Sequence, residues 1–316
     1  MHSSHRWRDV LGTVASVAQN KQRLLQELGV SSLTLSRWIS GESRPRPSNL
    51  RLLLHALPEH RIQFLAMWEE EFGTAVVHDI LSDTIQHEIS SLFYTQILHM
   101  HAHMFRLLHF RTICELILQQ ALEQLDPNRA GLYLAVMRCT PPTKGHKVRS
   151  VYESVWTMTF ADETMPIRPF FGREALVGEA LNTGRAQIIH SRQEGVRQFP
   201  HGWWGIMESA IAYPIHIADR FAGCLLIYSF MPGYFWLSSR QTLVQHYANL
   251  IAIAFEAEDF YAYDEIDIVR MPYFDSQRAI TPSYHQRLAM IMSEEDVNHQ
   301  EAERLVIQQL EKDLLS

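Results

Sequence analysis

The sequence predicts a multi-domain chain with four parts. They are an all-α N-terminal helix-turn-helix domain (residues 1–73), a long helical connector (74–105), an α+β domain whose antiparallel sheet is flanked by helices (106–262), and a helical C-terminal tail (263–316). Three observations predict this order: a short helix bounded by glycines near the N-terminus, a long stretch without glycine or proline, and apolar alternation from Ala130. With 316 residues and 47% hydrophobic composition, the chain has room for about two domains and their connectors.

The short N-terminal helix is delimited by its own residues. Gly29 can take the left-handed conformation that ends a preceding helix, and Ser31 suits the N-cap of the next one. Gly41 stops that helix, while Leu35 and Trp38 lie three residues apart and are expected to pack inward. The opposite face then carries the residues free to contact a partner: Ser32, Leu33, Ser36 and Arg37.

This stretch resembles the helix-turn-helix of the Xre/phage-repressor family. The matching pattern is Gly-Val-Ser-x-x-Thr-Leu-Ser-Arg-Trp-x-Ser-Gly-x-x-x-Pro, from Gly29 to Pro45. The resemblance implies that the partner is double-stranded DNA, that base edges are read by Ser32, Leu33 and Arg37, and that phosphate is held by Ser31 and Thr34. Leu33 replaces the polar reader common in the family, so the alternatives at that position are contact with a thymine methyl group or no base contact.

Charge supports a nucleic-acid partner for this segment. Residues 1–58 contain eight Lys/Arg against three Asp/Glu, a difference of +5, whereas the whole chain is −7 and the remainder therefore −12. A basic segment on an acidic body suits phosphate contact, and Arg44 and Arg46 are expected to supply it. The alternative is a helix-turn-helix kept as a protein-interaction fold, because the reading helix carries only one candidate base-reading charge.

The connector is predicted to continue as helix from Ile80 to Leu125, because no Gly or Pro interrupts it. Such a helix cannot bury its apolar face alone, so we expect a homodimer, with packing on the chain's own α+β domain as the alternative. His99 and His103 are four residues apart, a spacing that can hold a metal. No acid shares their face, so we expect interface or surface histidines and no metal site.

The α+β part shows strand and helix signals in sequence. Strands are predicted at Gly131–Met137 and Arg149–Phe160, and a hairpin over 209–229 turns at residues 218–220. A short helix near Gly172 ends at Gly184, and a long helix is predicted from Leu237 to about Phe260. The acids Glu153, Asp162 and Glu163 are interpreted as solvated.

These segments resemble a GAF domain over about residues 106–260. The resemblance rests on Leu-Val-Gly-Glu-Ala-Leu-Asn-Thr-Gly-Arg before a strand, on Ser-Ala-Ile-Ala-Tyr-Pro-Ile, and on Phe-Ala-Gly-Cys-Leu-Leu-Ile-Tyr-Ser before the terminal helix. It implies an antiparallel sheet with helices on both faces and helical ends that form dimers. GAF domains mostly sense small ligands, and a minority are structural dimerisers.

The same resemblance implies a ligand pocket over the sheet, beneath the loop 190–207. That loop concentrates aromatic and cationic side chains beside glycines, which suits a planar ring and an anion. The alternative is a loop that plugs the pocket with its two tryptophans. The candidate lining residues are Tyr152, Trp156, Phe171, Arg192, Arg197, Phe199, His201, Trp203, Trp204 and Met207.

The sequence gives little support for catalysis or for binding of the cofactors that are common in the family. No G-x-S-x-G, P-loop or HExxH pattern is present, so we expect no enzymatic activity. Neither Cys139-Thr140 nor Cys224-Leu225 matches the Cys-His of bilin attachment, the Asn-Lys-Phe-Asp-Glu signature of cyclic-nucleotide binding is missing, and haem through His190, His201 or His216 is a minor alternative. The cofactor stays unknown. The three cysteines lack CxxC spacing, which argues against a disulfide framework and structural zinc.

We therefore expect a cytoplasmic, dimeric, sequence-specific DNA-binding transcription regulator whose GAF domain senses a small ligand or mediates assembly. No apolar run reaches the ~18 residues that span a bilayer, so no membrane partner is expected. The alternative is a GAF scaffold with a vestigial helix-turn-helix that binds no DNA. In the tail, Ser293 is predicted to cap a last helix with an apolar stripe of Val306, Leu310 and Leu314.

Overall fold

The computed structural model describes residues 7–57, 60–73, 76–77, 80, 88–127, 129–159, 169–200, 203, 207–277, 283–294 and 297–316. The chain divides into two compact units. The first consists of residues 1–85 with 126–130, and the second of residues 86–125 with 131–316. Each unit has its own hydrophobic core and is described by itself.

The first unit is helical. Its helices are α1 (Trp7–Ser16), α2 (Ala18–Leu28), α3 (Ser32–Ser40), α4 (Pro47–Ala56) and α5 (Arg61–Phe72). The core is aromatic: Trp7 meets Trp68 edge to face with ring centroids 6.0 Å apart, and Phe64 stacks on Trp68 at 5.6 Å. Buried Leu35 and Trp38 anchor α3 in this unit. The N-terminal region is therefore helical, as the sequence predicted.

The predicted boundaries of α3 are confirmed. Gly29 takes φ 62° at the end of α2, the left-handed conformation that glycine adopts without strain. The Ser31 hydroxyl accepts a hydrogen bond from the backbone N–H of Thr34 at 3.1 Å, which caps the helix start. Gly41 ends the helix at φ 80°. These features depend on neighbouring residues in the sequence, so local rules suffice to predict them.

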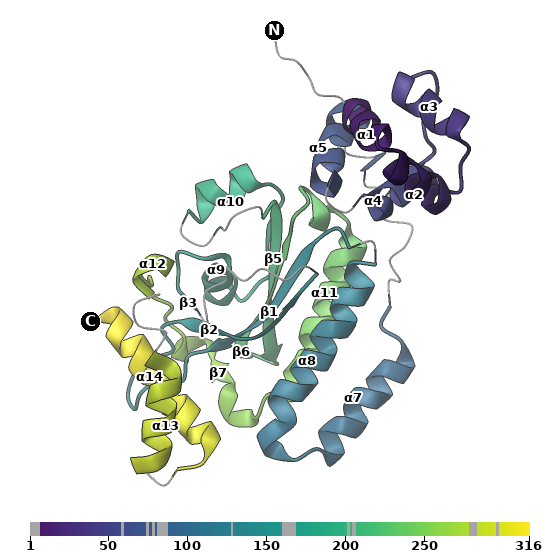
Figure 1. The fold of residues 1–316 in the computed structure, drawn as a ribbon. Coiled ribbons are helices and arrows are strands. Elements are labelled where there is room, and N and C mark those ends of the chain that lie inside the picture. Colours follow the sequence, from purple (N-terminus) through teal and green to yellow (C-terminus); the bar gives the residue numbers. More distant parts are fainter. Residues whose placement is uncertain are drawn as a thin grey trace. The chain divides into compact units, whose positions relative to one another are not determined.

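The prediction of one uninterrupted helix up to Leu125 is wrong. Among the described residues of this stretch, α7 (Ser91–His103) and α8 (Arg106–Leu125) are separate helices, because Met104 is extended at ψ 144°. The Ser90 hydroxyl caps the first of them by accepting from Phe93 N–H at 3.2 Å. The break lets α7 fold back along α8 and bury Phe93 and Ile97 within the second unit (Figure 1).

The second unit is built on an antiparallel sheet of order β3-β2-β1-β6-β5-β4, with β7 paired to β6. Its predicted strands and hairpin are confirmed, and Ala218 turns the hairpin at φ 52°. The strands are β1 (Leu132–Cys139), β2 (Val151–Met158), β3 (Phe170–Phe171), β4 (Gln187–Ile189), β5 (Ser209–Ile217), β6 (Arg220–Ser229) and β7 (Tyr261–Ala262).

Helices flank this sheet, as predicted. Alternate residues of β1 (Tyr133, Ala135 and Met137) share a core with α9 (Leu176–Thr183). The other face of the sheet lies against α8 and α11 (Ser238–Ile251), which run side by side (Figure 1). The short α10 (Arg192–Gln198) follows β4. The long helix predicted to reach Phe260 ends earlier, and the short 3-10 helices η3 (Ala252–Ala254) and η4 (Ala257–Asp259) follow it.

The tail ends in a helical hairpin that belongs to the same unit. The C-terminal elements are η5 (Tyr263–Glu265), α12 (Phe274–Gln277), α13 (Tyr284–Glu294) and α14 (His299–Leu315), while η2 (Tyr234–Trp236) precedes α11. The Asn298 side chain caps α14, so the predicted cap at Ser293 is wrong. The predicted stripe of Val306, Leu310 and Leu314 is buried in a core with Tyr152 and Phe170. The hairpin therefore covers the chain's own sheet.

Candidate functional site

The predicted DNA-contacting residues lie together on α3 and the segment that follows it. Leu33 is 63% exposed, and Ser32 and Arg37 are exposed beside it. The Ser31 and Thr34 hydroxyl oxygens lie 2.9 Å apart at the start of the helix. This face of α3 is thus polar except for one large apolar side chain, whereas the opposite face is buried.

The arginines of this segment differ in how they are held. Within the described residues, the side chain of Arg37 forms a single long ion pair, with 3.8 Å between its Nε and Glu42 Oε2, and both side chains are more than half exposed. The Arg44 guanidinium lies over the ring of Phe72 at 3.9 Å, a cation-π contact that fixes its position. Arg46 is exposed at the N-cap of α4. As far as the structure describes the chain, Arg37 is therefore held weakly, Arg46 has no side-chain partner, and Arg44 is fixed by its aromatic contact.

The positive charge of the first unit is local. Residues 59–85 add one arginine and six acids, so the charge of residues 1–85 is zero although residues 1–58 carry +5. Three of these acids, Glu69 to Glu71, lie near the end of α5, and Glu71 pairs with Arg8 at 2.7 Å. Any attraction to phosphate must therefore come from residues 1–58 and not from the unit as a whole.

The candidate pocket residues of the second unit do not form one lining. Phe171, Phe199, Trp203 and Met207 share the core beside α9. Tyr152 lies on the opposite face, because side chains alternate along β2 and Tyr152 pairs with Phe170 while Val151 pairs with Phe171. Trp156 is 47% exposed, and Arg192 and Arg197 are exposed on α10. His201 and Trp204 lie outside the described residues.

Trp203 fills the space over the sheet. Its Nε1 donates to the backbone oxygen of Met207 at 2.8 Å, and its ring meets Tyr228 edge to face at 5.4 Å. Gly195 lies so close that a Cβ there would be 2.4 Å from the indole. This is the placement expected if the loop plugs the pocket, the alternative that the sequence left open.

A buried carboxylate next to Tyr133 was not predicted from the sequence. Glu153 is 3% exposed, so the interpretation of a solvated side chain is wrong. The Tyr133 hydroxyl donates a hydrogen bond to Glu153 Oε2. Burial, together with the charge of Glu153, raises the pKa of Tyr133 well above its usual value. The signal available in the sequence was period two, since Glu153 follows buried Val151 on the same face of β2.

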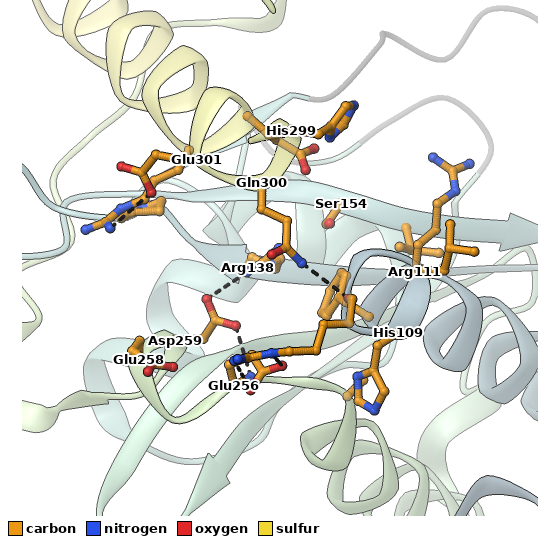
Figure 2. Close-up of a pocket in the computed structure, with 18 of the residues that line it drawn as sticks. His109, Arg111, Arg138, Ser154, Glu256, Glu258, Asp259, His299, Gln300 and Glu301 are labelled. Carbon is orange, nitrogen blue, oxygen red and sulfur yellow. Dashed lines mark hydrogen bonds and ion pairs between the residues drawn. The ribbon is translucent and has the colours of Figure 1, made fainter. Parts of the chain in front are cut away.

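A cleft of about 740 Å³ opens on the other face of the sheet (Figure 2). Four parts of the chain line it: the start of α8, the adjoining strands β1 and β2, the segment 254–261, and the first turns of α14. All of them belong to the second unit. Of its lining, the sequence analysis had named only Tyr152 as a site residue, because the cleft depends on the tail folding back.

Arg138 of β1 lies on the wall of this cleft. Its side chain is 19% exposed, and its Nη2 donates to Asp259 Oδ1 at 2.7 Å. The guanidinium also lies over the ring of Phe110 at 4.3 Å. Burial favours the neutral form, but interactions with Tyr152 and Asp259 outweigh it and raise the pKa of Arg138. The cleft therefore contains a fixed positive charge with little access to bulk water.

A β-bulge shapes the same wall. Val136 pairs with Val155 and Met137 with Glu153, so Ser154 is an extra residue in β2. Both Ser154 and Val155 then line the cleft. Bulges are common beside functional sites because they redirect a side chain. Here the bulge adds a hydroxyl to the cleft next to the strand that carries Arg138.

The rim of the cleft is charged with both signs. Arg106 pairs with Glu256 at 3.1 Å, and Gln300 of α14 donates from Nε2 to the backbone oxygen of Arg106 at 3.3 Å. Figure 2 shows Glu256, Glu258 and Asp259 gathered on one side of the cleft. Glu258 is exposed and has no hydrogen bond or ion pair within the described part of the chain.

In the described residues, no group of three or more His, Cys, Asp or Glu side chains is arranged to hold a metal ion. The four histidines near the α7–α8 turn form two pairs instead: His101 Nδ1 lies 2.9 Å from His109 Nε2, and the rings of His99 and His103 stack at 4.3 Å.

Across the described helices, none combines the length and apolar character needed to span a bilayer.

Comparison with known proteins identifies the sheet domain. A family model described as GAF domain matches residues 108–256, so this segment is a GAF domain. The chain is similar to the type II free methionine-R-sulfoxide reductase of Thermoplasma acidophilum, with 14% identity over 45% of this chain and 93% of that chain and a TM-score of 0.33. It is also similar to the GAF domain of the Acinetobacter phosphoenolpyruvate-protein phosphotransferase, with 10% identity over 52% and 93% and a TM-score of 0.37. No curated protein matches the chain.

Proposed function

We propose that the chain is a dimeric, sequence-specific DNA-binding transcription regulator whose GAF domain senses a small molecule or mediates assembly. The partner is double-stranded DNA, and α3 contacts it through the exposed face of the helix. The observation that carries the proposal is this face itself: Ser32, Leu33 and Arg37 are exposed on a helix that is capped at both ends and buried on its other side.

Among the residues of that face, Leu33 gives the strongest indication that the face contacts a partner. A leucine that is 63% exposed gives up the free energy of burial, about 1.5–3 kcal/mol for a fully buried side chain. Leu35 and Trp38 already anchor α3, so the fold does not need Leu33. An apolar side chain next to an arginine suits the major groove, where a thymine methyl group and a guanine edge are read by these two side-chain types.

The segment that follows α3 is suited to contact the phosphates of DNA. Arg46 is exposed at the start of α4, and Arg44 is held over Phe72 in a fixed position. Because residues 1–85 have no net charge, non-specific attraction to DNA is modest. We infer that useful affinity needs two copies of α3 on two half-sites, which is the usual arrangement for such helices.

Assembly is supported by the surface of the second unit. Its α7 contains no Asp, Glu, Lys or Arg, and its exposed side includes Leu92 and Leu98, while Phe105 and Leu108 are exposed at the turn that follows. Exposed apolar residues gathered on neighbouring turns are typical of an interface. A dimer through this surface brings two copies of α3 into one assembly.

The second candidate function is a GAF scaffold that binds no DNA. The zero net charge of residues 1–85 favours it, and so does Trp203, which fills the space where a sensed ligand would lie. In that case the α3 face contacts protein, and Leu33 is part of a protein interface.

Selection from a random-sequence DNA pool separates the two candidates. The full-length protein is expected to enrich one inverted-repeat motif, with half-sites spaced by about one helical turn, 10–10.5 base pairs. Sedimentation of the same preparation is expected to give a dimer. Failure to enrich any motif at low salt would refute the regulator and leave the scaffold.

A further inference from the structure

We propose that the cleft between α8 and α14 is a ligand site for a small zwitterion of the α-amino acid class. The carboxylate of the ligand binds Arg138 and Ser154, and its ammonium group binds the acidic rim at Glu258. The site lies on the face of the sheet opposite to Trp203, so it is separate from the space that Trp203 fills.

The carboxylate position follows from the donors of Arg138. A guanidinium has five N–H groups, and within the described residues only Nη2 has a hydrogen bond, to Asp259. The group is charged, largely screened from water, and forms part of the cleft wall. Arginine binds carboxylates through two parallel N–H groups on one edge of the guanidinium. The bond to Asp259 uses one Nη2 hydrogen, so the second Nη2 hydrogen, together with either Nε–H or Nη1–H, supplies such a pair.

Ser154 completes this position. The bulge in β2 places it on the cleft, and its hydroxyl has no hydrogen bond among the described residues. Figure 2 shows Ser154 on the strand beside Arg138. A hydroxyl donor next to a guanidinium is a common arrangement for holding one carboxylate oxygen in a defined orientation.

The charge of the cleft selects a zwitterion over an anion. Its lining contains four arginines (Arg106, Arg111, Arg138 and Arg304) and five carboxylates (Glu256, Glu258, Asp259, Glu301 and Glu303), so its formal charge is −1 with neutral histidines. A phosphate dianion would increase this negative charge, whereas a zwitterion adds none. Glu258 has no partner within the described residues and is the acid available to an ammonium group.

The dimensions of the cleft agree with a small molecule. Ligand pockets of roughly 300–1,000 Å³ hold compounds up to drug size, and this one measures about 740 Å³. Phe110, Val155 and Tyr261 supply apolar surface for a side chain. Gln300 and Arg106 close one end by a hydrogen bond between α14 and α8, so an occupant contacts both helices.

The test is isothermal titration calorimetry of the full-length protein without DNA, using each proteinogenic L-α-amino acid in turn. At least one is expected to bind. For that amino acid, the analogue without the amine, the analogue without the carboxylate, and inorganic phosphate are expected to bind at least about tenfold more weakly, a difference of 1.4 kcal/mol. Absence of binding by every amino acid, or equal binding of phosphate, overturns the proposal.

Variants locate the bound molecule. Glu258→Gln and Ser154→Ala replace side chains without partners in the described structure, so the fold is expected to persist and affinity to fall about threefold to tenfold. Glu294→Gln, an exposed glutamate of α13 that does not line the cleft, is the matched control and is expected to leave affinity unchanged. Arg138→Lys is expected to abolish measurable binding, since lysine lacks the planar pair of donors. Unchanged affinity in both Glu258→Gln and Ser154→Ala contradicts the assignment.

Only the regulatory consequence, a change in DNA affinity on amino acid binding, rests on the proposed function. The calorimetry contains no DNA, so a failed DNA selection leaves the ligand site standing, and a failed titration leaves the DNA-binding proposal standing. Protein that binds an amino acid but no DNA would be a ligand-binding scaffold.

Discussion

Tyr133 donates its hydroxyl hydrogen to the carboxylate of Glu153 in the core between the sheet and α9. Both groups are buried, so the hydrogen bond between them replaces hydrogen bonds with water that each group loses on folding. This pair lies beside Tyr228 and Trp203, in the part of the domain that the sequence had marked as a pocket.

Removing one partner of this pair is expected to destabilise the second unit. Tyr133→Phe leaves the Glu153 carboxylate with one hydrogen bond fewer, which costs about 1–3 kcal/mol. The double variant Tyr133→Phe/Glu153→Leu removes both polar groups and is expected to lose less than the sum of the single variants. Urea unfolding followed by circular dichroism measures the coupling; strictly additive effects would show that the hydrogen bond contributes nothing.

Alkaline pH is expected to weaken the same unit. Burial and the charge of Glu153 raise the pKa of Tyr133 above its usual value near 10, and Tyr228 is raised for the same reasons. Above pH 10 the unfolded tyrosines lose protons that the folded ones keep, so the unfolded state binds fewer protons and stability falls as pH rises.

Each such group contributes a slope of about 1.4 kcal/mol per pH unit. Urea unfolding between pH 8 and 11 provides the measurement, and the decline is expected to be shallower in Tyr133→Phe. A decline of equal steepness in that variant would show that Tyr133 does not contribute.

The cap of α3 gives a test within the first unit. Ser31→Ala removes the hydrogen bond from Thr34 N–H and is expected to cost about 1 kcal/mol. Ser36→Ala, on the same helix but exposed and without a capping role, is expected to change stability by less than about 0.5 kcal/mol. Hydrogen exchange of the α3 amides measures both, and equal protection in the two variants would contradict the capping role.

These two serines also show what the sequence could predict. Caps, turns and strand alternation depend on residues a few positions apart, so the α3 boundaries and the β5–β6 hairpin were predicted. The break at Met104 was missed, because no glycine or proline marks it and it results from α7 packing on α8.

The candidate site was harder to predict for the same physical reason. The cleft around Arg138 needs α8, β2 and α14 to meet, and α14 begins more than 100 residues after the end of β2. One signal was present: Arg138 is a lone charge in an apolar strand and therefore needs a partner. Its partner, Asp259, lies in a segment that was predicted to continue the long helix to about Phe260.

Salt dependence tests the phosphate contacts. Arg46→Ala is expected to weaken binding to all DNA sequences alike and to reduce the slope of log K against log salt by about 1. Arg44→Ala is expected to do the same while also losing its contact with Phe72. Arg185→Ala, an exposed arginine of the second unit, is the matched control. A slope unchanged by Arg46→Ala would remove that residue from the DNA interface.

The most direct test of the central claim is the affinity of the Arg37→Ala protein for the DNA motif enriched in selection, measured by fluorescence anisotropy at several salt concentrations. We expect a loss of about 1–3 kcal/mol per half-site with relaxed preference at one base pair, because Arg37 is proposed to read a guanine edge from the exposed face of α3. Affinity equal to that of the unaltered protein at every salt concentration would contradict it.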